Sequence, residues 1–323
     1  MNKKLYGTAI LGVFVIASVL MLAFNTGTVL AQDEVIPDWV GSETCADCHS
    51  TIYEQQQRHG HSYKLNRVVD GQPPEYPYSE VLDTPEGYTW DDISFVIGGF
   101  SWKARFIDHD GYIITGDEDA TTQYNFPLID SRTGEVIKEA GWVGYHAGEE
   151  NKPYDCGSCH TTAYNHDAET NMYDMPGMIG QWTEEGVQCE ECHGPGSLHV
   201  QEPIRAQMPI ERSTEACGNC HYRGSEGVVE SSGGFIKHHE QYEEIATAPH
   251  AAMECIDCHN PHQSAVYADE EFNPNRGQRV TCTSCHFVQT RSPEHVENNV
   301  TCVDCHMPPM TASGNRNEEL LWG

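Results

Sequence analysis

One short pattern, Cys-x-x-Cys-His, occurs seven times in this 323-residue chain and uses all fourteen of its cysteines. At this spacing two thiols can form thioether bonds to one porphyrin, and the histidine that follows can bind the porphyrin's iron. The pattern therefore predicts seven covalently bound haem c groups, numbered here in chain order. The attachment cysteines are Cys45, Cys48, Cys156, Cys159, Cys189, Cys192, Cys217, Cys220, Cys255, Cys258, Cys282, Cys285, Cys302 and Cys305, and the proximal histidines are His49, His160, His193, His221, His259, His286 and His306.

Two other uses of paired cysteines fit the pattern less well. Zinc and thioredoxin-like sites do not require a histidine directly after the second cysteine. Histidine makes up only 18 of the 323 residues, yet it fills that position in all seven copies. A disulfide framework would not impose one spacing on every cysteine.

Eleven histidines lie outside the pattern, enough to give every iron a second imidazole. Two imidazoles close the iron to exchangeable ligands and favour a low reduction potential, which suits electron transfer. We expect His109 and His166 to be surface residues and the methionines to fill gaps. The candidate second ligands are His61, His146, His199, His238, His239, His250, His262 and His295.

Local sequence gives some of these candidates a specific setting. His199 follows the rigid turn Gly194-Pro195-Gly196, which could hold its ring over a neighbouring haem. His262 is too close in sequence to His259 to reach the far side of that haem, so we expect it to serve another one. Since no histidine follows His306, one haem is expected to use His295 or a residue from a second molecule.

The first 31 residues are predicted to be a targeting segment. Lys3 and Lys4 precede an apolar stretch from Leu5 to Phe24, and Ala31 offers a small-residue cleavage site. A retained N-terminal anchor is the alternative, because about twenty apolar residues can span a bilayer. Either reading predicts export to the periplasm, the cell surface or the exterior.

The chain is strongly acidic, with a formal net charge of −31. This charge argues against nucleic acid and anionic lipid as partners, since both require basic patches. Membrane association is expected only if the N-terminal segment is retained. The acidic surface favours basic protein partners or cationic substrates, or it serves only to keep the protein soluble.

The spacing of the motifs predicts the organisation of the mature chain. The first haem segment is expected at 32–70, a haem-free β-rich subdomain at 71–145, and a six-haem region at 146–323. A hydrophobic content of 38% is low for a self-sufficient core. We therefore expect a mainly α-helical and irregular multihaem cytochrome wrapped around a chain of stacked haems, with a small β-hairpin subdomain between motifs 1 and 2.

The haem-free interval carries the strand signals. Segments 92–97 and 102–107 are rich in β-branched and aromatic residues and are separated by Gly98 and Gly99. A turn at 108–111 leads to a strand at 112–115, and a second hairpin is predicted from 126–129 to 135–137. Helical turns are expected at 50–57 and 238–246.

Several longer segments resemble the multihaem c-type cytochromes related to cytochrome c554. They are Tyr154 to Thr162 around motif 2, Gly186 to Gly196 around motif 3, Gly234 to Tyr242, and Cys258 to His262. The resemblance covers most of residues 40–310. It implies an exported electron carrier with bis-histidine haems in stacked and T-shaped pairs, and it makes filament formation a possibility, as in some related extracellular cytochromes.

The sequence thus favours a non-enzymatic, exported heptahaem electron relay. Its expected partners are redox proteins or an extracellular acceptor, and a homopolymeric filament is one form it could take. The alternative is a nitrite, hydroxylamine or sulfur-oxyanion oxidoreductase, which would need one iron with an open site. Haem storage is a third reading, but storage does not require closely spaced motifs.

Overall fold

The computed structural model describes residues 36–129, 134–222, 231–232, 235–236 and 241–307. The chain divides after Pro37, and every helix and strand given below belongs to the unit that begins at Asp38. The predicted targeting segment 1–31 and the candidate ligands His238 and His239 lie outside the described residues. Within the described ranges, no helix has the length and apolar character needed to cross a bilayer.

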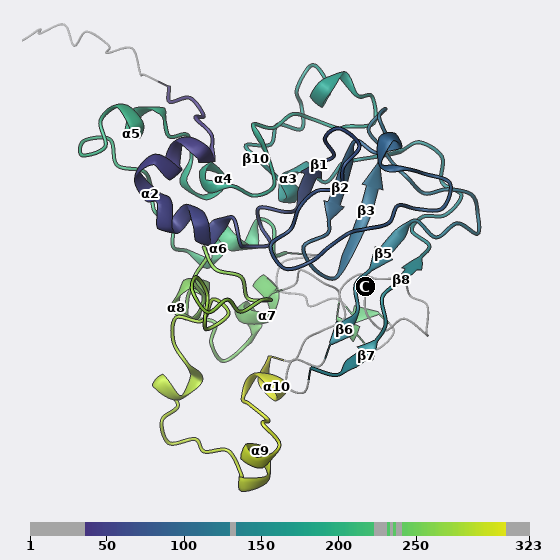
Figure 1. Cartoon of the computed structure of the whole chain (residues 1–323). Coiled ribbons are helices and arrows are strands. Elements are labelled where there is room, and N and C mark those ends of the chain that lie inside the picture. The colour runs from purple at the N-terminus through teal and green to yellow at the C-terminus, as the bar shows by residue number, and fades with distance from the viewer. Residues whose placement is uncertain (1–35, 130–133, 223–230, 233–234, 237–240, 308–323) are drawn as a thin grey trace, which may run out of the picture. The chain divides into compact units, whose positions relative to one another are not determined.

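The main structural element is a seven-stranded antiparallel sheet (Figure 1). Its strand order is β1-β2-β3-β4-β9, while β5 pairs with both β3 and β8. The strands are β1 (Leu65–Arg67), β2 (Phe95–Gly98), β3 (Lys103–Ile107), β4 (Tyr112–Ile113), β5 (Gln123–Asn125), β8 (Gly141–Val143) and β9 (Lys152–Pro153).

Three two-stranded ribbons accompany this sheet. They pair β6 (Leu128–Ile129) with β7 (Val136–Lys138), β10 (Thr161–Thr162) with β11 (Glu184–Glu185), and β12 (Ser231–Ser232) with β13 (Phe235–Ile236).

The centre of the sheet is the β2–β3 hairpin, in which Phe95 pairs with Ile107 and Val96 with Phe106. Gly98 begins its turn at φ 76°, and a Cβ there would lie 2.7 Å from the carbonyl oxygen of Lys103, so only glycine fits. The sheet is larger than the small hairpin subdomain expected from the sequence. It recruits β1 and β9 from beyond residues 71–145, and these strands are too short to show an alternating pattern.

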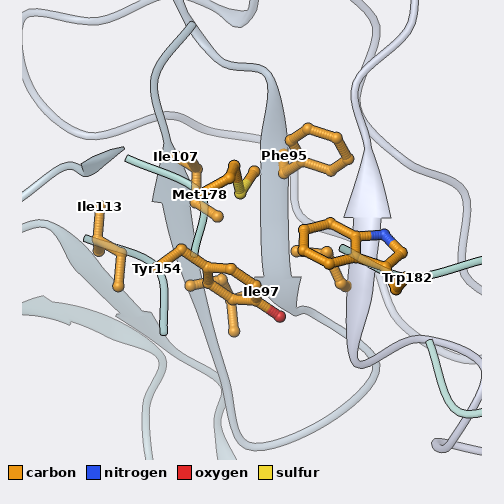
Figure 2. Packing of buried hydrophobic residues seen from close by; sticks show 8 residues of the cluster. Phe95, Ile97, Ile107, Ile113, Tyr154, Met178 and Trp182 are labelled. Carbon is orange, nitrogen blue, oxygen red and sulfur yellow. The ribbon is translucent and has the colours of Figure 1, made fainter. Parts of the chain in front are cut away.

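Both faces of the sheet are buried. Alternating side chains of β2 and β3 divide between two hydrophobic clusters, as the two-residue period of a strand requires. Figure 2 shows one cluster, in which Phe95, Ile97 and Ile107 meet Tyr154 and Trp182. Cys156 packs against this cluster, so the second motif adjoins the protein's own core.

Phe106 offers a test of this core. Its side chain is fully buried in the cluster on the other face of the sheet, together with Val96 and Ala104. Phe106→Ala should therefore lower the free energy of unfolding by about 3–5 kcal/mol. Leu82→Ala is the matched control, since Leu82 is 69% exposed and its truncation should cost less than about 0.5 kcal/mol. Guanidinium unfolding followed by far-ultraviolet circular dichroism would measure both, and equal losses would contradict this description of the core.

The helices are short, apart from α2 (Ser42–Gln56). The helix α2 was expected only after motif 1, but it runs through the motif and kinks at His49 (φ −113°, ψ 39°). The others are α3 (Gly157–His160), α4 (Cys189–His193), α5 (Ser197–Gln201), α6 (Thr214–Gly218), α7 (Gln241–Thr247), α8 (Cys255–Cys258), α9 (Pro293–Glu297) and α10 (Val303–His306), with 3₁₀ turns at Trp90–Asp92, Met172–Asp174 and Cys282–Ser284.

The apolar core ends where the motifs become dense. Within the described parts of the chain, Val187 is the last residue whose apolar side chain is buried. Five of the seven motifs follow it, and large side chains there are exposed, among them Phe287 at 79% and Val288 at 70%. A segment of this kind needs another source of apolar surface to fold around, which agrees with the low hydrophobic content of the sequence.

Candidate functional site

Each Cys-x-x-Cys-His motif lies wholly or partly in a helical turn. Motifs 1, 2, 3, 5 and 7 lie in or at the start of α2, α3, α4, α8 and α10, motif 4 begins in α6, and motif 6 begins in a 3₁₀ turn. Side chains three and four positions apart share one face of a helical turn. The two thiols and the imidazole of each motif are therefore directed to the same side, as attachment to one porphyrin requires.

Four of the motif histidines face a second imidazole from elsewhere in the chain. In each pair, one ring belongs to a motif and the other to a histidine that the sequence had singled out as a second ligand. The pairs, with ring-centre distances and angles between ring planes, are His49–His199 (6.3 Å, 17°), His221–His61 (6.0 Å, 57°), His193–His262 (6.2 Å, 6°) and His286–His250 (5.9 Å, 82°).

This spacing fits one iron between two imidazoles. A histidine nitrogen lies about 2 Å from the metal it binds, and about 1 Å from the centre of its own ring, so two opposed rings are about 6 Å apart. The four pairs thus have the separation that a haem iron would need.

The second ring nitrogen of several of these histidines is also held in place. Nδ1 lies 3.1 Å from the Pro209 carbonyl oxygen in His193, and 2.9 Å from that of Ala206 in His199. In His160 it lies 3.1 Å from the Lys64 carbonyl oxygen. Metal-binding histidines usually donate this other N–H to a carbonyl or carboxylate, which fixes the ring and leaves Nε2 for the metal.

Burial favours the neutral form of four of the proposed iron ligands by lowering their pKa. Desolvation, and then the nearby charge of His59, lowers the pKa of His61 well below its usual value. Burial likewise lowers the pKa of His221, His259 and His262. Since neutral imidazole is the form that binds a metal, the environment favours ligation.

Comparison with known proteins agrees with this donor set. Residues 143–222 match the family described as "Cytochrome c7 and related cytochrome c". The dissimilatory sulfite reductase MccA of Wolinella succinogenes is 22% identical over 86% of this chain and 51% of its own length. The multiheme cytochrome MtrA of Shewanella baltica is 29% identical over 38% of this chain and 36% of its own.

The chain is a multihaem c-type cytochrome. Among solved structures, the octaheme sulfite reductase MccA of Wolinella succinogenes has the same fold, with a TM-score of 0.50 and 16% identity over 82% of this chain and 53% of that one. The cytochrome thus spans about half the length of the sulfite reductase and about a third of MtrA.

Thiols from different motifs of the cytochrome come into contact. Cys45 of motif 1 interacts with Cys189 of motif 3. The two further contacts join Cys159 of motif 2 to Cys220 of motif 4, and Cys217 of motif 4 to Cys255 of motif 5. Motif 4 therefore adjoins two others, and neighbours in space are not always neighbours in sequence.

His59 is a half-buried histidine to which the sequence assigned no role. Its Nδ1 accepts a hydrogen bond from the backbone N–H of His61 (3.0 Å), and its ring lies 4.2 Å from that of His61. Burial, followed by the charges of Lys64 and other histidines, lowers its pKa to about 3. The two rings are too close for a porphyrin to lie between them, so His59 supports His61. The closely spaced His59-Gly60-His61 sequence was the only signal available.

Two predicted second ligands do not face a motif histidine. His146 is 47% exposed, has a positive φ of 50°, and forms a 2.6 Å ion pair with Glu149. His295 is exposed on α9. Among the described residues, no ring contact gives His259 or His306 a second imidazole. His166, expected on the surface, is exposed and pairs with Asp167.

Proposed function

We propose that the cytochrome is an exported relay that passes single electrons along seven covalently bound haems, most of them ligated by two histidines. The four opposed imidazole pairs are the observation that carries this proposal. A pair of this kind occupies both axial positions of an iron and leaves no site for a substrate. Haem supplies the one-electron Fe(III)/Fe(II) couple, while the chain supplies ligands, spacing and electrostatics.

The thiol contacts support a close approach between neighbouring haems. Thioether attachment fixes a porphyrin edge to each cysteine, so motifs whose thiols touch carry haems with adjacent edges. These contacts link haem 1 with haem 3, haem 2 with haem 4, and haem 4 with haem 5. Haem 4 would therefore be a junction in the relay.

Export and an acidic surface define the expected partners. Covalent haem, the predicted targeting segment and the formal charge of −31 support a periplasmic or extracellular carrier that meets basic redox proteins or an external acceptor. A filament of identical subunits is a further form of the same relay, built through a head-to-tail contact that does not close.

An oxidoreductase is the second candidate. The similarity to a sulfite reductase over 86% of the chain favours it, as does the lack of an opposed imidazole for His259 and His306 among the described residues. An enzyme of this class needs one iron that can exchange its ligand.

Anaerobic reductive titration of the purified protein separates the two functions. The relay predicts reversible uptake of seven electrons per chain, low-spin ferric haem before reduction, and no turnover of sulfite, nitrite or hydroxylamine. A high-spin ferric signal from the unaltered protein, together with turnover of one of these substrates, would establish the enzyme instead.

The ring planes predict the ferric electron paramagnetic resonance spectrum. Nearly parallel imidazoles, as in His193–His262 at 6°, give rhombic low-spin signals, whereas nearly perpendicular ones, as in His250–His286 at 82°, give a single signal at large g. We expect both types in one sample. His250→Ala should remove a large-g signal and leave the rhombic signals unchanged, and loss of a rhombic signal instead would contradict the assignment.

A further inference from the structure

A carboxylate inside the third motif is buried. Glu190 is the residue directly after Cys189, and its side chain is only 1% exposed. Glutamate is rarely buried to this extent unless its charge is matched by hydrogen bonds. The attachment of a haem requires no particular residue at this position of the motif.

Backbone N–H groups from two distant segments surround this carboxylate. Val40 donates to both oxygens, at 3.0 and 3.1 Å, and Gly41 donates to Oε2 at 2.8 Å. From the other direction, Gly196 donates to Oε1 at 2.7 Å. Charge-assisted bonds of this kind are among the stronger hydrogen bonds in proteins, and here they join segments about 150 residues apart.

The two segments carry the two halves of one imidazole pair. Gly41 is the N-cap of α2, which bears His49, and Gly196 is the N-cap of α5, which bears His199. A Cβ on Gly196 would lie 3.1 Å from a Val40 methyl carbon and 3.3 Å from Oε1 of Glu190, so the approach is tight.

Additional bonds fasten the same segments together. The backbone N–H of Ser197 donates to the Asp38 carbonyl oxygen (3.1 Å), and the Asp38 N–H donates to the Ser197 hydroxyl (2.8 Å). Glu184 also accepts hydrogen bonds from the backbone N–H and the hydroxyl of Ser42, both at 3.0 Å, but these bonds involve α2 and not α5. Of these carboxylates, Glu190 is the one that bonds to both helices.

We propose that Glu190 is a positioning residue for the first haem: its carboxylate fixes α2 and α5 to one point in motif 3 and so holds His199 opposite His49. The inference rests on the proposed function only in taking these two imidazoles as the ligands of haem 1. The same contact ties haem 1 to the motif of haem 3, whose Cys189 thiol meets Cys45.

The test uses the full exported protein with Glu190→Ala and Glu190→Gln. Alanine removes all of these bonds, so His199 should leave the iron and one haem per chain should become high-spin and bind carbon monoxide when reduced. Glutamine keeps one acceptor oxygen and should give a smaller high-spin fraction. Glu191→Gln is the control, because that carboxylate accepts instead from the Ala163 N–H (2.7 Å) in the segment after motif 2, and it should leave haem 1 low-spin.

A double variant identifies which haem responds. If Glu190 acts through His199, then Glu190→Ala with His199→Ala should bind no more carbon monoxide than His199→Ala alone. Additive binding, or Glu190 variants that stay fully low-spin, would overturn the inference. If a variant matures without one haem, peptide mapping should find motif 1 empty, and loss at motif 3 would count against the proposal.

If His49 and His199 are not the two ligands of haem 1, a different result is expected. In that case His199→Ala itself would leave every haem low-spin and unable to bind carbon monoxide. That result would reject the assignment of His49 and His199, whatever the Glu190 variants show.

Discussion

Replacement of His61 by methionine should raise the reduction potential of the haem on motif 4 and slow the passage of electrons through it. The ring of His61 lies 6.0 Å from that of His221, and methionine opposite histidine gives a higher potential than a second histidine. A rise of on the order of 0.1 V is modest within the ~0.8 V range that axial ligands span. At 59 mV per tenfold change in an equilibrium constant, it would shift the equilibrium for electron escape from this haem by about 50-fold toward the reduced haem.

The effect on the whole relay should be large because of where motif 4 lies. Its thiols contact those of motif 2 and motif 5, so an electron held on haem 4 blocks two connections. Spectroelectrochemical titration would measure the potential, and flash reduction would measure the transfer rate. His166→Met is the control, since His166 is 60% exposed and bonded to Asp167. Unchanged potentials in His61→Met, without the absorption of a methionine-ligated haem, would refute this pairing.

Removal of the His250 side chain should convert one haem from low-spin to high-spin. His250 faces His286 of motif 6 at 5.9 Å, so His250→Ala leaves that iron without its second ligand. Added imidazole should enter the vacated position and restore the low-spin spectrum. Resonance Raman spectroscopy would report both changes.

His295→Ala is the comparison for this variant. The sequence proposes both histidines as second ligands, but no ring contact places His295 opposite a motif histidine among the described residues. The haem on motif 6 should therefore remain low-spin in His295→Ala. Conversion of that haem by His295→Ala, with none by His250→Ala, would show that the assignment is reversed.

The cofactor could be predicted from the sequence because the chemistry is local. A motif of five residues contains both thiols and the proximal imidazole, and a helical turn is enough to present them on one side. Steric reach within a short segment also predicted that His262 would not serve the haem of His259, and in the structure it faces His193.

The pairing itself depends on contacts that sequence spacing does not contain. His61 follows motif 1 but faces His221 of motif 4, and His250 precedes motif 5 but faces His286 of motif 6. These partners are set by how the irregular segments pack, and such segments have no periodicity to interpret. For the same reason the position of His59 against the ring of His61 could not be foreseen from its polar surroundings.

The sheet illustrates the same limit. The apolar segments of β2 and β3, with glycines between them, were long enough to predict as strands. The strands β1 and β9 have three and two residues and join the sheet through long-range pairing alone. The environment of Glu190 also could not be predicted from the sequence. Nothing next to Cys189 shows that the Glu190 carboxylate would be enclosed by Val40, Gly41 and Gly196.

The intact mass of the mature, exported protein under denaturing conditions tests the central claim most directly, since only covalently attached haem survives unfolding. We predict a single species that carries seven haems, with both cysteines of each motif converted to thioethers. Bare polypeptide, or a mature species with fewer than seven haems, would contradict the account.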